Sequence, residues 1–283
     1  MNTKQLIVVI GGVILFSGLI IFGKTTSSKP KETPISNANT KPSSAINTKD
    51  LLTNIKQKLT EKQLESIQKL EKDIDNQSSN EDKIHLYHQL AKYWKDSVNY
   101  FEPYAIYTAE AAKLDNSEKS LTFAAHLFIQ SLLNEPEPSM QNWLATNGKV
   151  LLEKANEINP NNDSTKVGLG ACYILGNVSD NPMQGLQLVR EVEKKNPNNM
   201  FAQWVLALGG KRSGQFDKAI ERFTIILKNN SKSLPAMLHL AECYELKGDN
   251  ANAIIWYKKV QSIFDNDEAR KELQAKIEEL SKK

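Results

Sequence analysis

The chain has 283 residues, of which 40% are hydrophobic and 24% are charged, a composition typical of one or two globular domains or a solenoid. Its formal net charge is +3, and the first 48 residues contribute +4 through five lysines and one glutamate. The remaining residues are therefore almost neutral, which excludes nucleic acid as the expected partner.

Residues 6–22, LIVVIGGVILFSGLIIF, form an uncharged and mostly apolar run that Gln5 and Gly23 extend to residues 5–23. A helix of this length spans about 28 Å, close to the thickness of the hydrocarbon core of a bilayer. The run is longer than the apolar region of a signal peptide, and no small-x-small cleavage site follows it. We therefore expect residues 1–23 to be a single-pass transmembrane anchor, with a cleaved signal peptide as the alternative.

Residues 24–48 are rich in Lys, Thr, Ser, Asn and Pro, and contain only two large apolar residues, Ile35 and Ile46. Such a composition cannot build a core, so the sequence predicts a disordered linker. More lysines follow the anchor than precede it, and this distribution by itself favours a cytoplasmic body.

The next segment, residues 49–81, has two amphipathic stripes. Leu51, Leu52, Ile55 and Leu59 form the first, and Leu64, Ile67, Leu70 and Ile74 form the second. Thr60 and Gln63 have the spacing of a capping box at the start of the second helix. We expect a cap or a degenerate repeat here, since two short stripes are too few heptads for a coiled coil.

From residue 82 to 265 the sequence predicts pairs of helices. The first expected helices are Ile84–Ser97, Tyr104–Leu114, Leu121–Leu133 and Trp143–Ile158, with insertions at Asn99–Pro103, Asn134–Ser139 and Gly176–Pro182. A last helix, Asn266–Leu280, has a polar outer face and is expected to cap the chain within residues 266–283. Gly209-Gly210 would let the preceding helix end early.

A repeat with a period of 34 residues is clearest near the C-terminus. Leu206-Ala207, Gly214, Ala219 and Phe223 recur as Leu240-Ala241, Gly248, Ala253 and Tyr257. This period and these small residues resemble the tetratricopeptide repeat (TPR) family. The resemblance implies an all-α, right-handed solenoid of about five repeats over residues 82–265.

The same resemblance places certain positions of each first helix in a concave groove that binds protein or peptide. In this chain those positions include Phe201, Trp204, Leu208, Lys211, Arg212, Leu238, Glu242 and Glu245. Phe201 and Trp204 beside Lys211 and Arg212 would suit an extended peptide that carries an apolar anchor residue and an acidic residue. Alternatively, Phe201 and Trp204 pack against the neighbouring repeat, while Lys211 and Arg212 pair with Glu242 and Glu245.

Enzyme chemistry is not expected, because the sequence has no catalytic triad and no paired-carboxylate setting, and we predict no catalytic residue, metal or cofactor. His85 and His88 lack a third ligand for a metal. Cys172 and Cys243 fall at the same position two repeats apart, too far for a disulfide.

The expected function is a membrane-tethered scaffold or adaptor that organises a protein complex, with no small-molecule substrate. Bacterial envelope TPR proteins with such an anchor often face the periplasm, and this resemblance favours a periplasmic body here. The alternatives are an organelle import or docking receptor with a cytoplasmic body, or a structural subunit of a fixed envelope assembly.

Overall fold

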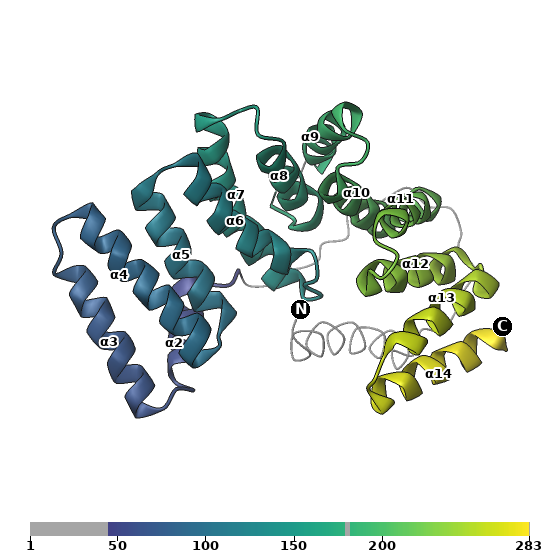
Figure 1. The fold of residues 1–283 in the computed structure, drawn as a ribbon, viewed down its shortest axis with the longest axis horizontal. Helices are drawn as coiled ribbons and strands as arrows, with labels where there is room; N and C mark the ends of the chain where they lie inside the picture. Colours follow the sequence, from purple (N-terminus) through teal and green to yellow (C-terminus); the bar gives the residue numbers. More distant parts are fainter. Residues whose placement is uncertain (1–44, 179–181, 283) are drawn as a thin grey trace.

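The computed structural model describes residues 45–178 and 182–282, and these residues form a curved stack of helices without a strand (Figure 1). The described helices are α2 (Thr48–Lys56), α3 (Glu61–Asp75), α4 (Asn80–Tyr93), η1 (Trp94–Val98), α5 (Phe101–Asp115), α6 (Glu118–Leu132), α7 (Pro138–Ile158), α8 (Asp163–Leu175), α9 (Pro182–Lys195), α10 (Met200–Arg212), α11 (Phe216–Asn229), α12 (Leu234–Lys247), α13 (Asn250–Ile263) and α14 (Asp267–Ser281). The predicted all-α solenoid is confirmed.

The predicted membrane anchor over residues 5–23 lies outside the described residues, as does the linker up to residue 44. Among the described helices, none combines the length and the apolar character that crossing a membrane requires.

Five helix pairs make up the stack, from α4–α5 to α12–α13, and each pair packs against the next (Figure 1). Gly214 and Gly248 end the first helices of the last two pairs with φ of 72° and 85°. These left-handed values favour glycine, and the two residues are 34 apart. The repeat found in the sequence is therefore a repeat of backbone conformation.

Glycines also set the separation between α8 and α9. A Cβ on Gly170 would lie 2.2 Å from Cγ2 of Val189, and one on Gly185 would lie 2.6 Å from Cβ of Tyr173. The two backbones therefore approach too closely for any larger residue at either position.

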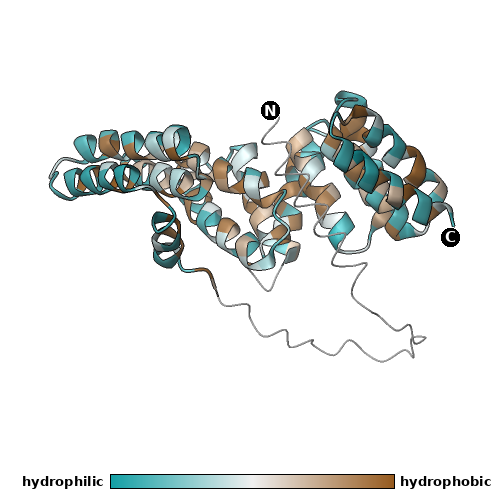
Figure 2. Ribbon diagram, turned by 90° about the horizontal axis from the view of Figure 1, so that it is seen from below, coloured by the Kyte–Doolittle hydropathy of each residue, from teal (hydrophilic) through white to brown (hydrophobic). Residues whose placement is uncertain are grey.

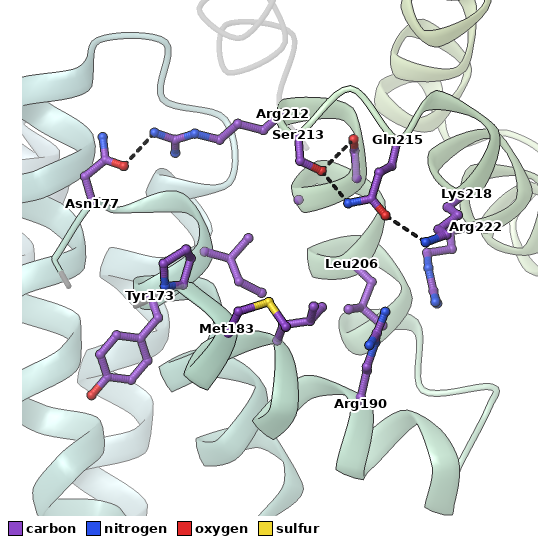
Figure 3. A pocket seen from close by; sticks show the side chains of 15 residues that line it. Tyr173, Asn177, Met183, Arg190, Leu206, Arg212, Ser213, Gln215, Lys218 and Arg222 are labelled. Carbon is purple, nitrogen blue, oxygen red and sulfur yellow. Dashed lines mark hydrogen bonds between the residues drawn. The ribbon is translucent and has the colours of Figure 1, made fainter. Parts of the chain in front are cut away.

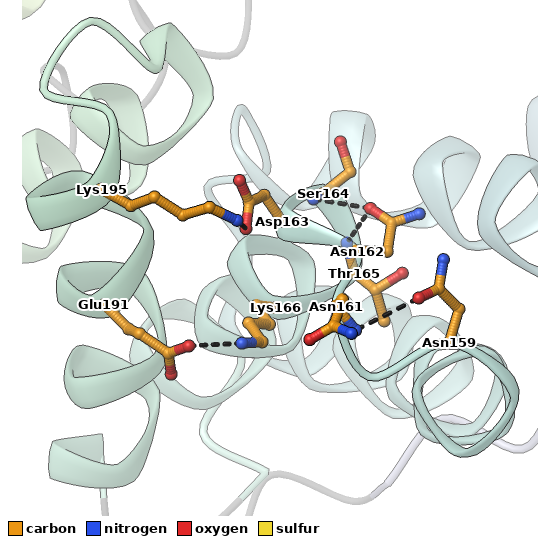
Figure 4. A network of polar contacts seen from close by, with 9 residues as sticks. All are labelled: Asn159, Asn161, Asn162, Asp163, Ser164, Thr165, Lys166, Glu191 and Lys195. Carbon is orange, nitrogen blue, oxygen red and sulfur yellow. Dashed lines mark hydrogen bonds and ion pairs between the residues drawn. The ribbon is translucent and has the colours of Figure 1, made fainter.

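Polar contacts hold the N-terminus of α8 in place (Figure 4). The Asn162 side chain accepts hydrogen bonds from the backbone N–H groups of Ser164 (2.8 Å) and Thr165 (3.2 Å) and so caps the helix. Two ion pairs, Lys195–Asp163 (3.1 Å) and Lys166–Glu191, join α8 to α9.

The glycine pair in α10 does not end the helix early, contrary to the expectation from the sequence. α10 continues to Arg212. A Cβ on Gly209 would lie 2.8 Å from Cγ2 of Ile174, so this glycine serves the close approach of α8.

The expected insertion at Asn99–Pro103 is also mostly absent, because helix resumes at Phe101. The extra length is instead taken up by the π-helical turn η1, which ends at Asn99 with a φ of 62°. Fully buried Trp94 begins this turn and meets Tyr100 edge-on at 6.4 Å between ring centroids.

At the N-terminal end, α3 lies beside α4 and covers the first repeat (Figure 1). Thr60 and Gln63 form the predicted capping box. Helix α2 lies to one side of the stacked pairs (Figure 2), where Leu51 and Leu52 pack against the cores. A Lys56–Glu71 ion pair of 2.7 Å links it to α3. Ile46, assigned to the linker from the sequence, packs against the main core.

At the other end, α14 packs on α13 and buries Ala269, Ile277 and Leu280. Ile277 and Leu280 join Ala241, Ala253 and Tyr257 in a small C-terminal core, whereas Ala269 belongs to the main core. The helix begins one residue later than expected, since Asn266 is its N-cap.

Candidate partner-binding site

Three of the predicted site residues come together in one internal contact between α10, α11 and α12. The Trp204 ring meets Phe223 edge-on at 5.6 Å between ring centroids and His239 at 5.9 Å. Lys211 forms an ion pair with Glu242, whose carboxylate also lies 2.9 Å from Nδ1 of His239. We call these five residues the α10–α12 cluster.

The carboxylate of Glu242 is held ionised by this cluster. Burial alone would raise its pKa, but the hydrogen bond from His239 and the positive charge of Lys211 lower the pKa to about 2. Lys211 and Glu242 therefore satisfy each other, and Trp204 packs internally. For these residues the structure favours the packing alternative over a free binding site.

The remaining charged residues of the predicted set have other partners. Arg212 donates hydrogen bonds to the carbonyl of Leu175 and, at 2.8 Å, to Oδ1 of Asn177, so it covers the C-terminal end of α8. Glu245 accepts a hydrogen bond from Tyr257 (2.8 Å) and pairs with Lys276 of α14 (2.6 Å). The predicted pairing of Arg212 with an acid of α12 is absent from the described contacts.

The apolar members of the set also separate. Leu208, predicted to line a binding groove, is only 9% exposed and belongs to the core. Leu238 is half-buried against both the main and the C-terminal cores. Phe201 is half-buried and meets His126 of α6 edge-on at 5.7 Å.

An exposed aromatic residue on α6 was missed by the sequence analysis. Phe123 is 57% exposed and lines two adjoining hollows, of about 420 Å³ and about 250 Å³. The larger hollow also reaches His126 and Ser164, and so joins α6 to the start of α8. The sequence signal that could have identified it is a large apolar residue, Phe123, at a position between the buried Leu121 and Ala124 of the same helix.

His126 has an unsatisfied polar group at this hollow. Its Nε2 is buried without a hydrogen-bond partner among the described residues, and burial lowers its pKa. An unpaired buried nitrogen costs free energy, which a donor or acceptor of a bound partner would recover.

A further cleft of about 400 Å³ lies between α9 and the α10–α11 pair (Figure 3). Its apolar lining includes Tyr173, Ile174, Met183, Leu186 and Leu206. The charged residues that line it are Arg190, Arg212, Lys218 and Arg222, and no acidic residue is among the described lining. Of these lining residues, only Arg212 belongs to the site predicted from the sequence.

No group of three His, Cys, Asp or Glu side chains within the described ranges is arranged to hold a metal ion. Both cysteines are buried and free, and burial raises the pKa of each thiol to about 12. Thiols with such a pKa are unreactive at neutral pH.

Comparison with known proteins agrees with this architecture. Residues 212–277 match the family model of the tetratricopeptide repeat. A tetratricopeptide repeat protein from Parabacteroides merdae ATCC 43184 has a TM-score of 0.55 and 15% identity, with 83% of this chain and 84% of that chain covered. This likeness shows the fold alone.

More remote structures include YrrB, described as a TPR protein with an unusual peptide-binding site (TM-score 0.43, 18% identity, 73% of this chain and 97% of that chain). MamA is similarly distant (TM-score 0.43, 17% identity, 63% and 90%). No curated protein matches the sequence.

Proposed function

We propose that this chain, whose residues 212–277 match the tetratricopeptide repeat, is a scaffold that binds a protein or peptide partner on the face formed by α6 and α8. Stacked helical repeats commonly use extended surfaces of this kind for binding. The tetratricopeptide repeat fold is typically a non-enzymatic scaffold for protein interaction, and the family that matches is not a catalytic one.

The observation that carries this proposal is the position of Phe123 between two hollows. Exposed aromatic side chains supply much of the affinity at protein interfaces. Beside Phe123, the unpaired Nε2 of His126 offers a polar contact, and Phe201 packs against the His126 ring. We call Phe123, His126 and Phe201 the α6 patch.

The proposal includes attachment to a membrane through residues 5–23. What supports it is the uncharged apolar run itself. The linker predicted between this run and Ile46 would keep the repeats close to the bilayer. A periplasmic location of the body rests on the resemblance to envelope TPR proteins.

Site-specific photo-crosslinking tests the binding face. A photoreactive phenylalanine analogue at position 123 of the full chain should crosslink in cells to one or a few proteins. The same analogue in place of Ile255, which is 50% exposed on α13, serves as the control and should not capture them. Equal capture from both positions, or capture only from α2 and α3, would mean that the scaffold uses another face.

Deletion of residues 1–24 tests the attachment separately. We expect the shortened chain to leave the membrane fraction while keeping its helical circular dichroism and its crosslinks from position 123. Retention in the membrane fraction after the deletion would refute the anchor without touching the binding face.

A further inference from the structure

The cleft between α9 and the α10–α11 pair carries more positive charge than the described carboxylates neutralise. Of its four cationic residues, only Arg222 has a carboxylate partner among the described residues, namely Glu193. Lys218 donates a hydrogen bond to neutral Gln215 at 2.8 Å, and Arg190 has no described ion pair. Arg212 contacts only neutral oxygens, at Leu175 and Asn177.

Apolar side chains lie between these cations. Met183, on the first turn of α9, is 55% exposed (Figure 3). Leu186 lies three residues further along the same helix and also lines the cleft. Leu206 approaches from α10. A methionine adapts its shape to a partner's side chain, so an exposed one inside a cleft suits binding of a variable apolar group.

The size of the cleft limits what fits. A volume of about 400 Å³ is at the lower end of the range for ligand sites, and accommodates one large side chain with its backbone. The cations lie along both walls, with Arg190 on α9 and Lys218 on α11. An extended chain that places one apolar residue in the centre would set its neighbours beside these charges.

The chain's own N-terminal segment does not complement this cleft. Residues 24–44 carry four lysines and one glutamate, the same sign of charge as the cleft walls. Like charges at an interface disfavour association. The partner is therefore expected to come from another molecule.

We propose that this cleft binds an extended acidic peptide segment of a partner protein. A large apolar side chain of the peptide contacts Met183 and Leu186, and flanking carboxylates pair with Arg190 and Lys218. Arg212, held by Asn177, adds a fixed guanidinium at the edge of the cleft. This second binding site is distinct from the α6 patch.

The probe is a library of random 12-residue peptides displayed on phage, selected against the full chain in detergent at low salt. Enriched peptides should carry several carboxylates around at least one large apolar residue. A selection that enriches basic peptides, or yields no acidic ones, overturns the proposal. Because surface charges are screened by salt, binding of an enriched synthetic peptide should weaken as salt is raised.

Two double variants then locate the site with matched changes of charge. Arg190→Gln with Lys218→Gln removes two cleft cations, while Lys194→Gln with Lys228→Gln removes two exposed cations from the same helices, α9 and α11. Fluorescence anisotropy should show about tenfold weaker binding for the first variant and less than about twofold change for the second. If both double variants weakened peptide binding equally, the effect would come from overall charge, and the proposed site would be refuted.

A third variant tests the apolar contact and keeps this proposal separate from the proposed function. Met183→Ser should weaken the enriched peptide without loss of helicity, since the side chain is largely exposed. Phe123→Ala should leave peptide binding unchanged, because Phe123 lies on α6, outside the cleft lining. Loss of binding in Phe123→Ala would place the peptide on the α6 patch instead.

Discussion

Lys211 of α10 and Glu242 of α12 form an ion pair across two consecutive repeats, and His239 contacts the same carboxylate. The two residues are 31 apart in sequence, close to the repeat period, so the pair links equivalent helices. Lys211 and Glu242 were both predicted to contact an external peptide, but in the structure they bind each other.

The Glu242 contact makes stability depend on acidity. The ordinary pKa of 4.5 falls to about 2 in the folded protein, so the stabilisation is complete above about pH 4.5 and is lost as the pH falls towards 2. We expect Glu242→Gln to remove about 2 kcal/mol at pH 6 and to flatten the dependence of the unfolding midpoint on pH below 5. Thermal unfolding followed by circular dichroism between pH 6 and 2.5 measures both effects.

Glu157→Gln is the control for this experiment, since Glu157 is exposed on α7. Its pH profile should run parallel to that of the unchanged protein. A Glu242→Gln profile with the same slope as this control would show that the ion pair contributes nothing to stability.

Two glycines in first helices should respond to alanine in opposite directions. A Cβ on Gly170 would meet Val189 at 2.2 Å and the carbonyl of Gly185 at 2.9 Å, whereas one on Gly210 has no neighbour closer than 3.5 Å. We expect Gly170→Ala to cost about 1–3 kcal/mol through overpacking. Gly210→Ala should add about 0.5–1 kcal/mol through helix propensity. Urea unfolding of both variants checks the prediction, and destabilisation of similar size would contradict it.

The side chain of Trp143 ties α2 to the stack, since its Nε1 donates a hydrogen bond to Oγ1 of Thr48 at 3.0 Å. Thr48→Val removes the acceptor and should weaken the docking of α2 by about 1 kcal/mol. Faster hydrogen exchange confined to α2 is the expected result. Thr53→Val, on the exposed side of the same helix, is the control and should not speed exchange in α2 to the same extent. Equal acceleration in both variants would show that the Trp143 hydrogen bond does not hold α2.

Substitutions at Trp204 and Phe123 are expected to differ in effect, the first lowering stability and the second lowering partner binding. Trp204 packs against fully buried Phe223, so Trp204→Ala should cost about 3 kcal/mol. Phe123 is mostly exposed, so Phe123→Ala should change stability by less than about 0.5 kcal/mol while abolishing capture of the partner. Denaturant unfolding combined with partner pull-down checks both. Loss of the partner without loss of stability in Trp204→Ala would restore Trp204 to the binding site.

Local patterns predicted much of the architecture. The 34-residue spacing of Gly214 and Gly248, the small residues of the first helices and the capping box at Thr60 depend on short-range geometry, and each is present in the structure. The π-helical turn at Trp94 and the continued helix through Gly209-Gly210 were missed, because packing against neighbouring helices overrides local propensity there.

The candidate site could be predicted only in part from the sequence. Repeat positions identify which residues of α10 and α12 share a face, and this much follows from the period along the chain. They do not identify which of these groups pair with each other. Trp204, Lys211 and Glu242 pair internally around His239, while Phe201 turns to His126 of α6, because the curvature of the stack sets the distances between distant helices. The unpaired cations of the cleft and the exposed ring of Phe123 stay accessible to a partner. Which groups pair internally and which stay accessible depends on long-range packing, and no local sequence pattern contains that information.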